Sequence, residues 1–379
     1  MAFVVRFLHS ADWQLGMTRH FLGVEAQARF SAARTEVIRT IGALATAEGC
    51  QFVVVAGDVF ESNHVERQVV VRALEAMSAT PSVTFYLLPG NHDPLDAASV
   101  FRSPTFVEHR PQNVVVLDDA APVAVAPGVE LLAAPWRSKR PLSDLVADVS
   151  DGVVADGTLR IVVGHGAVDV MSPSSSNPAL VSVATAEARL ADGAVHYVAL
   201  GDRHSTTDVG ASGRLWYSGA PEPTDHLETD AGNVLVVELA EGSVSVTPRP
   251  VGTWRFERAE FDLAGEADCA ALATWLDALP DKERTIVRLS LIGQLSLVAK
   301  ARLDESLDHH RDLFAAVEVW APSSDLVVLP DDGDFADLDF AGFARNAVAD
   351  LRIAAVDGDD AESSRDALGL LYRLARSGR

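Results

Sequence analysis

Five short motifs each place metal-binding side chains directly after an apolar run. They are ADWQ (11–14), AGDVF (56–60), PGNHD (89–93), VGHG (163–166) and LGDRH (200–204). Carboxylates, imidazoles and amide oxygens are the groups that bind divalent cations in proteins. One such motif carries little information, whereas five in succession predict a metal centre assembled from distant parts of the chain.

The apolar runs before these motifs predict the strands that position them. Buried strands are expected in QFVVVAG (51–57), VTFYLLPG (83–90), RIVVGHG (160–166) and VHYVALGD (195–202). Segments 25–47 and 65–79 have the spacing of amphipathic helices. Ligands at the carboxyl ends of neighbouring strands converge on one crevice. The sequence becomes strand-rich after residue 212, which predicts an α/β sandwich with one mostly β layer on its far side.

Length and composition allow one large domain plus one or two small ones, with a sizeable hydrophobic core. The chain has 379 residues, of which 48% are hydrophobic. No apolar run is long enough for a signal peptide or a membrane span, so no contact with a membrane is expected. Cys50 and Cys269 form no CxxC motif, which favours two buried, reduced thiols in a cytoplasmic protein.

The net charge of −23 argues against a protein that binds nucleic acid by its overall charge. The objection weakens if phosphate contact is local, through metal ions and a few arginines, or if a partner supplies the basic surface.

The set of motifs resembles the calcineurin-like metallophosphoesterase superfamily. Later segments resemble its SbcD-type DNA repair exonuclease branch: WYSGAPEPTD (216–225), IGQLSLVAKARLDE (292–305), FAAVEVW (314–320) and LVVLPDDGD (326–334). The motifs are specific to the superfamily, and the later segments carry the nuclease assignment.

The resemblance implies a four-layer α/β/β/α metallophosphoesterase sandwich with a small α+β capping domain and a helical C-terminal tail. The pattern of expected strands and helices changes near residue 250. The expected boundaries are therefore nuclease domain 1–250, capping domain 251–320 and C-terminal helical region 321–379. Two helices are expected in the tail, near 340–355 and 361–377. The apolar stripe of Leu368, Leu371 and Tyr372 fits packing on the chain's own body and docking of a partner equally well.

The resemblance also implies two divalent ions about 3.5–4 Å apart, bridged by Asp58. One ion would be held by Asp12, Gln14, Asp58 and His204. The other would be held by Asp58, Asn91, His165 and Asp202. His92 would face the phosphate, as a transition-state stabiliser or as the proton donor to the leaving oxygen, and Asp93 would orient the His92 ring.

Three positions depart from the family pattern, which has histidine at 14, at 202 and often at 61. Gln14, Asp202 and Glu61 all keep an oxygen donor, so the site is expected to be active. Three carboxylates then face the ions where the usual set has two. This predicts a preference for Mn²⁺, or Mg²⁺, over Zn²⁺ and a more alkaline pH optimum. Glu61 has two interpretations: a proton or water acceptor, or a polar residue at the cleft rim.

Other polar residues keep two interpretations each. Arg137, in the basic stretch PWRSKRP (135–141), could contact a phosphate backbone or belong to a solvated loop. Arg203 could reach a substrate phosphate or pair with a carboxylate. His9 could support a ligand, although a satisfied histidine within the sheet is favoured.

The function implied is a metal-dependent DNA exonuclease or phosphodiesterase. It would be the nuclease subunit of an SbcCD-like repair complex, a homodimer with an SbcC-like coiled-coil ATPase as partner. It would work in the cytoplasm, on the nucleoid when bound to DNA. A small-molecule phosphodiesterase or phosphatase and a catalytically impaired scaffold are the alternatives. The capping-like module argues against the first, and the retained ligands argue against the second. Exonuclease or endonuclease action, polarity and strand preference stay open.

Overall fold

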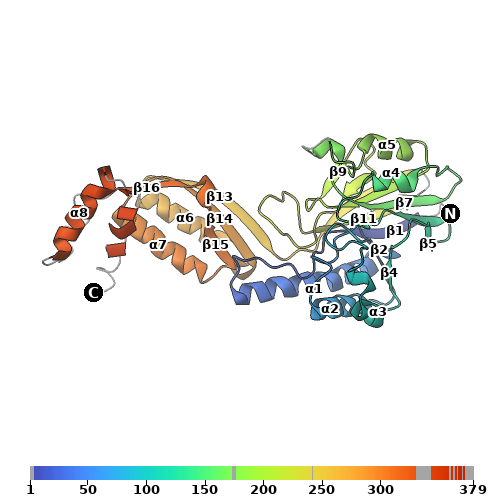
Figure 1. The fold of residues 1–379 in the computed structure, drawn as a ribbon, viewed down its shortest axis with the longest axis horizontal. Coiled ribbons are helices and arrows are strands. Elements are labelled where there is room, and N and C mark those ends of the chain that lie inside the picture. The colour runs from blue at the N-terminus through green and yellow to red at the C-terminus, as the bar shows by residue number, and fades with distance from the viewer. Residues whose placement is uncertain are drawn as a thin grey trace. The chain divides into compact units, whose positions relative to one another are not determined.

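The computed structural model describes residues 4–172, 176–240, 242–329, 343–357 and 360–371, the last without 362, 365 and 369. Figure 1 labels most of the helices and strands. The chain divides into two compact units. One comprises Met1–His20 and Gln27–Trp254, and the other comprises Phe21–Ala26 and Arg255–Arg379.

The first unit contains two six-stranded sheets, the first in the order β12-β11-β1-β2-β3-β4. Its strands are β1 (Val4–Ser10), β2 (Phe52–Val55), β3 (Thr84–Leu87), β4 (Val114–Val116), β11 (Asn233–Ala240) and β12 (Ser243–Pro250). Strands β1 to β4 are parallel, whereas β11 pairs antiparallel with both β1 and β12.

The second sheet has the order β5-β6-β7-β8-β10-β9. Its strands are β5 (Val123–Ala126), β6 (Val129–Ala133), β7 (Leu159–His165), β8 (Tyr197–Gly201), β9 (Thr207–Val209) and β10 (Leu215–Tyr217). Strands β6, β7, β8 and β10 are parallel, and the two edge strands pair antiparallel with their neighbours.

The strand-rich stretch after residue 212 does not form a separate β layer, so this part of the prediction is wrong. Strand β10 joins the second sheet, and β11 and β12 extend the first. The reason is burial on both faces: in β11, Val234 and Val236 pack on one side of the sheet and Leu235 and Val237 on the other. A strand of this kind belongs inside a sandwich.

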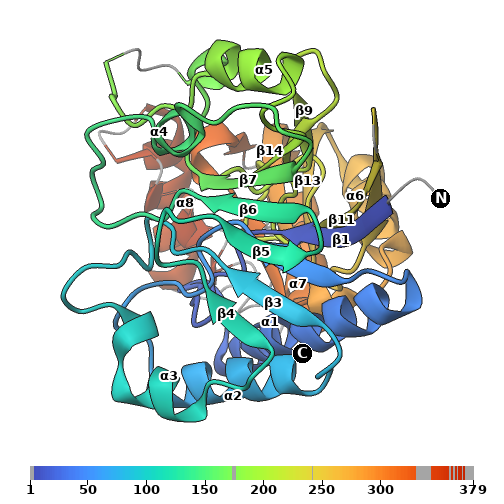
Figure 2. The ribbon, with the colours of Figure 1, turned by 90° about the vertical axis from the view of Figure 1, so that its right-hand side faces the viewer.

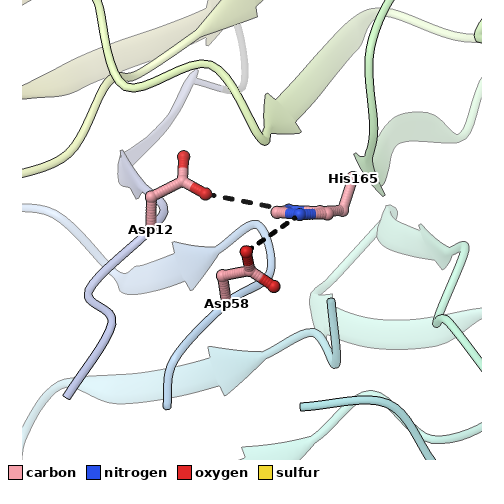
Figure 3. A group of neighbouring side chains, drawn as sticks. All are labelled: Asp12, Asp58 and His165. Atoms are coloured by element: carbon pink, nitrogen blue, oxygen red, sulfur yellow. Dashed lines mark ion pairs between the residues drawn. The ribbon is translucent and has the colours of Figure 1, made fainter. Parts of the chain in front are cut away.

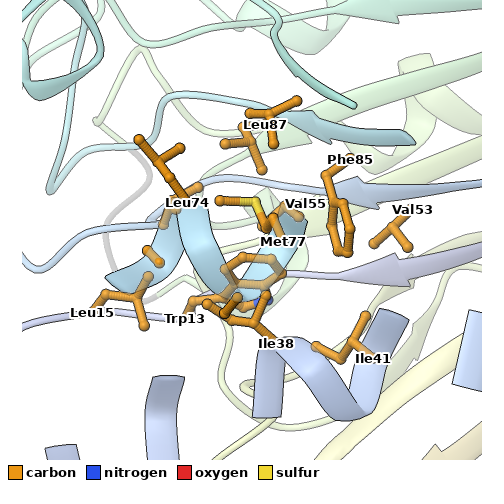
Figure 4. Close-up of a cluster of buried hydrophobic side chains, with 14 of the residues drawn as sticks. Trp13, Leu15, Ile38, Ile41, Val53, Val55, Leu74, Met77, Phe85 and Leu87 are labelled. Atoms are coloured by element: carbon orange, nitrogen blue, oxygen red, sulfur yellow. The ribbon is translucent and has the colours of Figure 1, made fainter. Parts of the chain in front are cut away.

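Helices cover the outer face of each sheet, which gives the four layers seen in Figure 2. The first sheet is covered by α1 (Val24–Ala47), α2 (Arg67–Ser78) and α3 (Pro104–His109), and the second by α4 (Leu145–Ser150) and α5 (Val183–Ala191). Figure 4 shows Ile38 and Met77 in the core beneath the first sheet. Between the sheets, the ring of Phe7 stacks 5.1 Å from that of Phe52. The predicted α/β sandwich is confirmed.

The second unit has its own sheet, in which β13, β15 and β16 all run parallel to β14. Its elements are β13 (Arg255–Leu263), α6 (Glu266–Ala278), β14 (Thr285–Ser296), α7 (Leu297–Arg311), β15 (Ala316–Val319), β16 (Asp325–Leu329) and α8 (Phe343–Asp357). Helices α6 and α7 pack on one face through a leucine-rich core that includes Leu272 and Leu303.

Leu368 is fully buried and packs with Leu297, Ala301 and Val348, so it serves the chain's own core. Tyr372 and residues 330–342, including the end of the 326–334 motif, lie outside the described residues. So does much of the second tail helix predicted over 361–377. Within the described ranges, no helix has the length and hydropathy needed to cross a membrane.

Candidate metal centre

The predicted ligands follow the carboxyl ends of five strands, drawn from both sheets. Strand β1 leads to Asp12 and Gln14, β2 to Asp58, and β3 to Asn91 and His92; β7 ends at His165, and β8 leads to Asp202 and His204. Side chains at such strand ends meet at one edge of a sheet. The structure brings this set together at a single place.

Asp12, Asp58 and His165 form the buried centre of the site (Figure 3). Each offers one ligand atom, and these atoms all lie within 4.8 Å of one another. His165 Nε2 is 3.4 Å from Asp58 Oδ2, and His165 Nδ1 is 4.0 Å from Asp12 Oδ1. Two carboxylates and an imidazole at this spacing can bind a divalent metal ion.

His165 also contacts two further predicted ligands. Its Nε2 lies 2.7 Å from Asn91 Oδ1 and 3.9 Å from Asp202 Oδ1. Its Nδ1 lies 2.9 Å from the carbonyl oxygen of Ala56, which accepts the Nδ1 proton. This backbone contact fixes the ring so that Nε2 faces the carboxylates.

His204 lies beside Gln14, with 3.2 Å between the two Nε2 atoms. On the other side of the ring, His204 Nδ1 lies 2.7 Å from Thr224 Oγ1 and 2.9 Å from Glu228 Oε1. Because Glu228 accepts the Nδ1 proton, His204 Nε2 is left to bind a metal. Sequence reasoning missed Glu228, because no motif or spacing connects it to the strand ends.

His92 is held by backbone contacts at the edge of the site. Its backbone N–H donates to Asp58 Oδ1 at 2.9 Å, and its Nδ1 lies 2.9 Å from the carbonyl oxygen of Glu61. The prediction that Asp93 orients the ring is wrong. The fully buried Asp93 carboxylate accepts the backbone N–H groups of Phe60 and Gly90, at 2.9 and 2.7 Å. Asp93 therefore stabilises the two loops, and the Glu61 carbonyl orients His92.

A family model for calcineurin-like phosphoesterases matches residues 5–206, more than half of the 379-residue chain and all five motifs. The chain belongs to the calcineurin-like phosphoesterase family. This phosphoesterase is 26% identical over 331 residues to the SbcD subunit of the nuclease SbcCD from Rhodobacter capsulatus, a match that spans 74% of this chain and 78% of that protein.

Two solved structures resemble the phosphoesterase at low sequence identity. The protein TT1561 of Thermus thermophilus is 8% identical with a TM-score of 0.40, covering 66% of this chain and 100% of that one. The purple acid phosphatase PPD1 from yellow lupin (Lupinus luteus) seeds is 11% identical with a TM-score of 0.42, covering 66% and 52%.

The backbone of the phosphoesterase is unusual at four of the predicted ligand positions. Asp12, Gln14, Asp58 and Asp202 have φ of 54°, 43°, 52° and 102°, and only Asp281 shares this property among the other described non-glycine residues. Each such residue costs of order 1–3 kcal/mol and persists where the surrounding structure determines it. The loops therefore hold the ligands in place before any cation binds.

The electrostatics of the site suit a cation. Burial raises the pKa of Asp12 to about 6. Burial also acts to raise the pKa of Asp58, but the neighbouring His165 and His92 outweigh it and hold that pKa below its ordinary value. Burial would lower the pKa of His165, yet Asp58 and Asp12 raise it well above its ordinary value. The cluster of Asp12, Asp58 and His165 thus stabilises a positive charge, whether a proton on His165 or a bound cation.

Gln14 supplies independent support for a metal ion at this site. Its Oε1 atom is buried, and no group among the described residues donates a hydrogen bond to it. An unpaired buried carbonyl oxygen costs free energy, which a divalent cation would offset. The residues present therefore fit a metal ion.

Three predicted substrate-binding residues lie outside this centre. Arg203 is exposed, and its Nε donates to Thr207 Oγ1 at 2.9 Å. Arg137 is exposed, donates to the carbonyl oxygen of Asp118 and lines an apolar pocket of about 210 Å³. Glu61 Oε1 lies 3.9 Å from His92 Nδ1, and burial raises the pKa of Glu61. Only Glu61 reaches a residue of the site itself.

Proposed function

We propose that this phosphoesterase is a metal-dependent DNA nuclease, the nuclease subunit of an SbcCD-like repair complex. The observation that carries the chemistry is the buried group of Asp12, Asp58 and His165, placed at the strand ends of the sandwich. The observation that favours DNA as substrate is similarity to a nuclease subunit over most of both chains.

Two divalent ions are proposed to share Asp58. One would be held by Asp12, Gln14, Asp58 and His204. The other would be held by Asp58, Asn91, His165 and Asp202. When bound, such ions polarise a phosphoester and lower the pKa of an attacking water. The three carboxylates in the set favour Mn²⁺, or Mg²⁺, over Zn²⁺.

His92 is the residue that we propose to face the scissile phosphate. Its Nδ1 proton is directed to the Glu61 carbonyl, so Nε2 is the nitrogen that faces the substrate. With its side chain 36% exposed, His92 is more accessible than the buried ligands. Nε2 would stabilise the negative charge of the transition state or donate a proton to the leaving oxygen. Arg203 and Arg137, both exposed, would contact the strand further out, and Glu61 would line the rim of the site.

The rest of the chain would serve DNA and protein partners. From the resemblance of the later segments to SbcD-type nucleases, we propose that residues 251–320 cap the DNA and that the region 321–379 docks an SbcC-like coiled-coil ATPase. The working form would be a cytoplasmic homodimer, associated with the nucleoid when DNA is bound. A partner with basic surface would offset the net charge of −23, which opposes binding to DNA by this chain alone.

The test is degradation of end-labelled linear DNA by the purified chain, with and without Mn²⁺. Asp58→Asn removes the bridging carboxylate with little change in shape, and His92→Gln removes the imidazole. A matched control is His309→Gln, an exposed histidine in the second unit. We expect Mn²⁺-dependent degradation that is lost in the first two variants and kept in the third.

Three results would contradict the proposal. Degradation that survives Asp58→Asn would come from a contaminating nuclease. No degradation with excess Mn²⁺, even with the coiled-coil ATPase added, would favour a scaffold. Hydrolysis of bis(p-nitrophenyl) phosphate but not of DNA would favour a small-molecule phosphodiesterase.

A further inference from the structure

Arg34 is a fully buried arginine whose hydrogen bonds run to backbone carbonyls. It lies on α1, is 1% exposed, and its guanidinium lies 4.5 Å above the ring of Phe30. Burial lowers the pKa of Arg34 to about 10, which leaves it charged at neutral pH. Nearby carboxylates, Glu222 first among them, favour the charge, but no described carboxylate forms an ion pair with the guanidinium. An unpaired buried charge is unfavourable, so its retention calls for a specific role.

The two ends of the guanidinium contact two different loops of the metal centre. Nη1 donates to the carbonyl oxygen of Trp13 at 3.1 Å, and Nη2 donates to that of Pro223 at 2.9 Å. Trp13 stands between the predicted ligands Asp12 and Gln14. Pro223 precedes Thr224, which contacts His204 Nδ1.

Both loops serve the same proposed ion. The 12–14 turn supplies Asp12 and Gln14, and the 222–228 loop holds His204 through Thr224 and Glu228. The carboxylate of Glu222, in the second loop, is occupied by the backbone N–H groups of Thr253 and Trp254. Arg34 is thus a direct connection between the two halves of this ligand set.

We propose that Arg34 is a positioning residue that fixes the distance between Asp12 and Gln14 on one side and His204 on the other. It thereby selectively strengthens one of the two ion sites. The inference rests on the proposed metal centre and deepens it. Only arginine has a planar fork that can donate to both loops, whereas lysine carries a single ammonium group.

The experiment is Mn²⁺ binding by the metal-free full-length chain, followed by electron paramagnetic resonance. The method counts bound ions and distinguishes a coupled pair from single ions. Arg34→Gln removes the fork and Arg34→Lys keeps the charge. The matched control is Arg160→Gln. Arg160 is also a buried arginine, but it pairs with Glu130 and Asp156 at the opposite end of β7 from His165.

The expected result is two ions in the wild type and in Arg160→Gln. Both Arg34 variants should bind one ion normally and the other about 10–100-fold more weakly, the usual effect of removing support from a ligand. The coupled-pair signal should then give way to a single-ion signal. Loss of stability alone would not produce this pattern.

Three outcomes would overturn the inference. In the first, the Arg34→Gln variant folds and binds both ions as tightly as the wild type. If that variant does not fold, the same result for a folded Arg34→Lys variant would count equally. Both variants could be unfolded by circular dichroism even with Mn²⁺, which would assign Arg34 to the fold. Finally, wild-type protein that binds no Mn²⁺ would overturn the metal centre itself and this inference with it.

Discussion

Glu228 Oε1 lies 2.9 Å from His204 Nδ1, while the opposite nitrogen, His204 Nε2, lies 3.2 Å from Gln14 Nε2. One side of the ring is therefore fixed by a buried carboxylate, and the other side faces the predicted ligands. Such carboxylate–histidine pairs orient the ring and raise its basicity toward a metal.

The first prediction concerns this pair. Glu228→Gln should lower the affinity for one Mn²⁺ ion about 10–100-fold, because the amide no longer favours the required tautomer of His204. Titration calorimetry of the metal-free protein measures the change. Glu238→Gln, at a glutamate that pairs with Arg6, is the control. Equal affinities in wild type and Glu228→Gln would contradict the role of Glu228.

The second prediction concerns Asp202, where the resemblance to the family led us to expect histidine. Asp202→His removes one negative charge from the ligand set, which should lower the pKa of the attacking water and move the pH optimum of hydrolysis to lower pH. Activity with Zn²⁺ should rise relative to Mn²⁺. Rates on bis(p-nitrophenyl) phosphate across pH measure both effects. An optimum that stays in place would refute the charge argument.

The third prediction uses His9, which is fully buried with Nδ1 3.0 Å from Tyr197 Oη and Nε2 3.1 Å from the Leu200 carbonyl oxygen. The favoured interpretation, a satisfied histidine in the sheet, is confirmed. Burial lowers the pKa of His9 to about 3. In the unfolded chain its pKa is about 6.5, so between these values only the unfolded chain binds this proton.

Stability therefore falls as the pH drops below about 6.5, by up to about 1.4 kcal/mol per pH unit from this group. His9→Gln should make the free energy of unfolding fall less steeply between pH 6.5 and pH 4.5, in urea titrations with EDTA present. His309→Gln, at an exposed histidine, should keep the wild-type slope. A His9→Gln slope equal to that of the wild type would show that His9 is protonated in the fold.

The fourth prediction concerns Gly57, which has φ of +94° and whose added Cβ would lie 2.1 Å from His165 Nδ1. Gly57→Ala should displace His165 and cost more than about 3 kcal/mol, because overpacking adds to backbone strain. Gly152→Ala is the control: φ is +69° and nothing lies within 4 Å of the added atom. It should cost about 1–2 kcal/mol and leave Mn²⁺ binding unchanged. Equal losses in the two variants would contradict the steric argument.

The sandwich and its buried strands were predictable because both faces of each strand are apolar. The runs that became β2, β3, β7 and β8 are continuous for this reason. Strand β5 could not be predicted in the same way, because it is a short edge strand that is only partly buried. The position of β11 depends on its partner β1, which no local pattern specifies.

The residues at the centre of the site were predictable from motifs at strand ends. The residues that hold the surrounding loops in place were not. Asp12 and Asp58 come shortly after buried strands, and His165 is the last residue of one. Arg34 and Pro223 are 189 residues apart in sequence, and their contact depends on the packing of a helix against a loop. Asp93 was misassigned because its position beside His92 in sequence says nothing of the direction in which its side chain points.

The left-handed backbone at the predicted ligand positions limits which mutations this enzyme can accept. Aspartate, asparagine and histidine adopt positive φ several-fold more readily than most residues, and β-branched residues almost never do. Positions 12, 58 and 202 therefore restrict the choice of side chain before any metal binds, and the residues that this backbone admits most readily are also metal ligands. Gln14, at φ of 43°, is the one exception. A library of variants at these positions would be depleted of valine, isoleucine and threonine even when it is selected for folding alone.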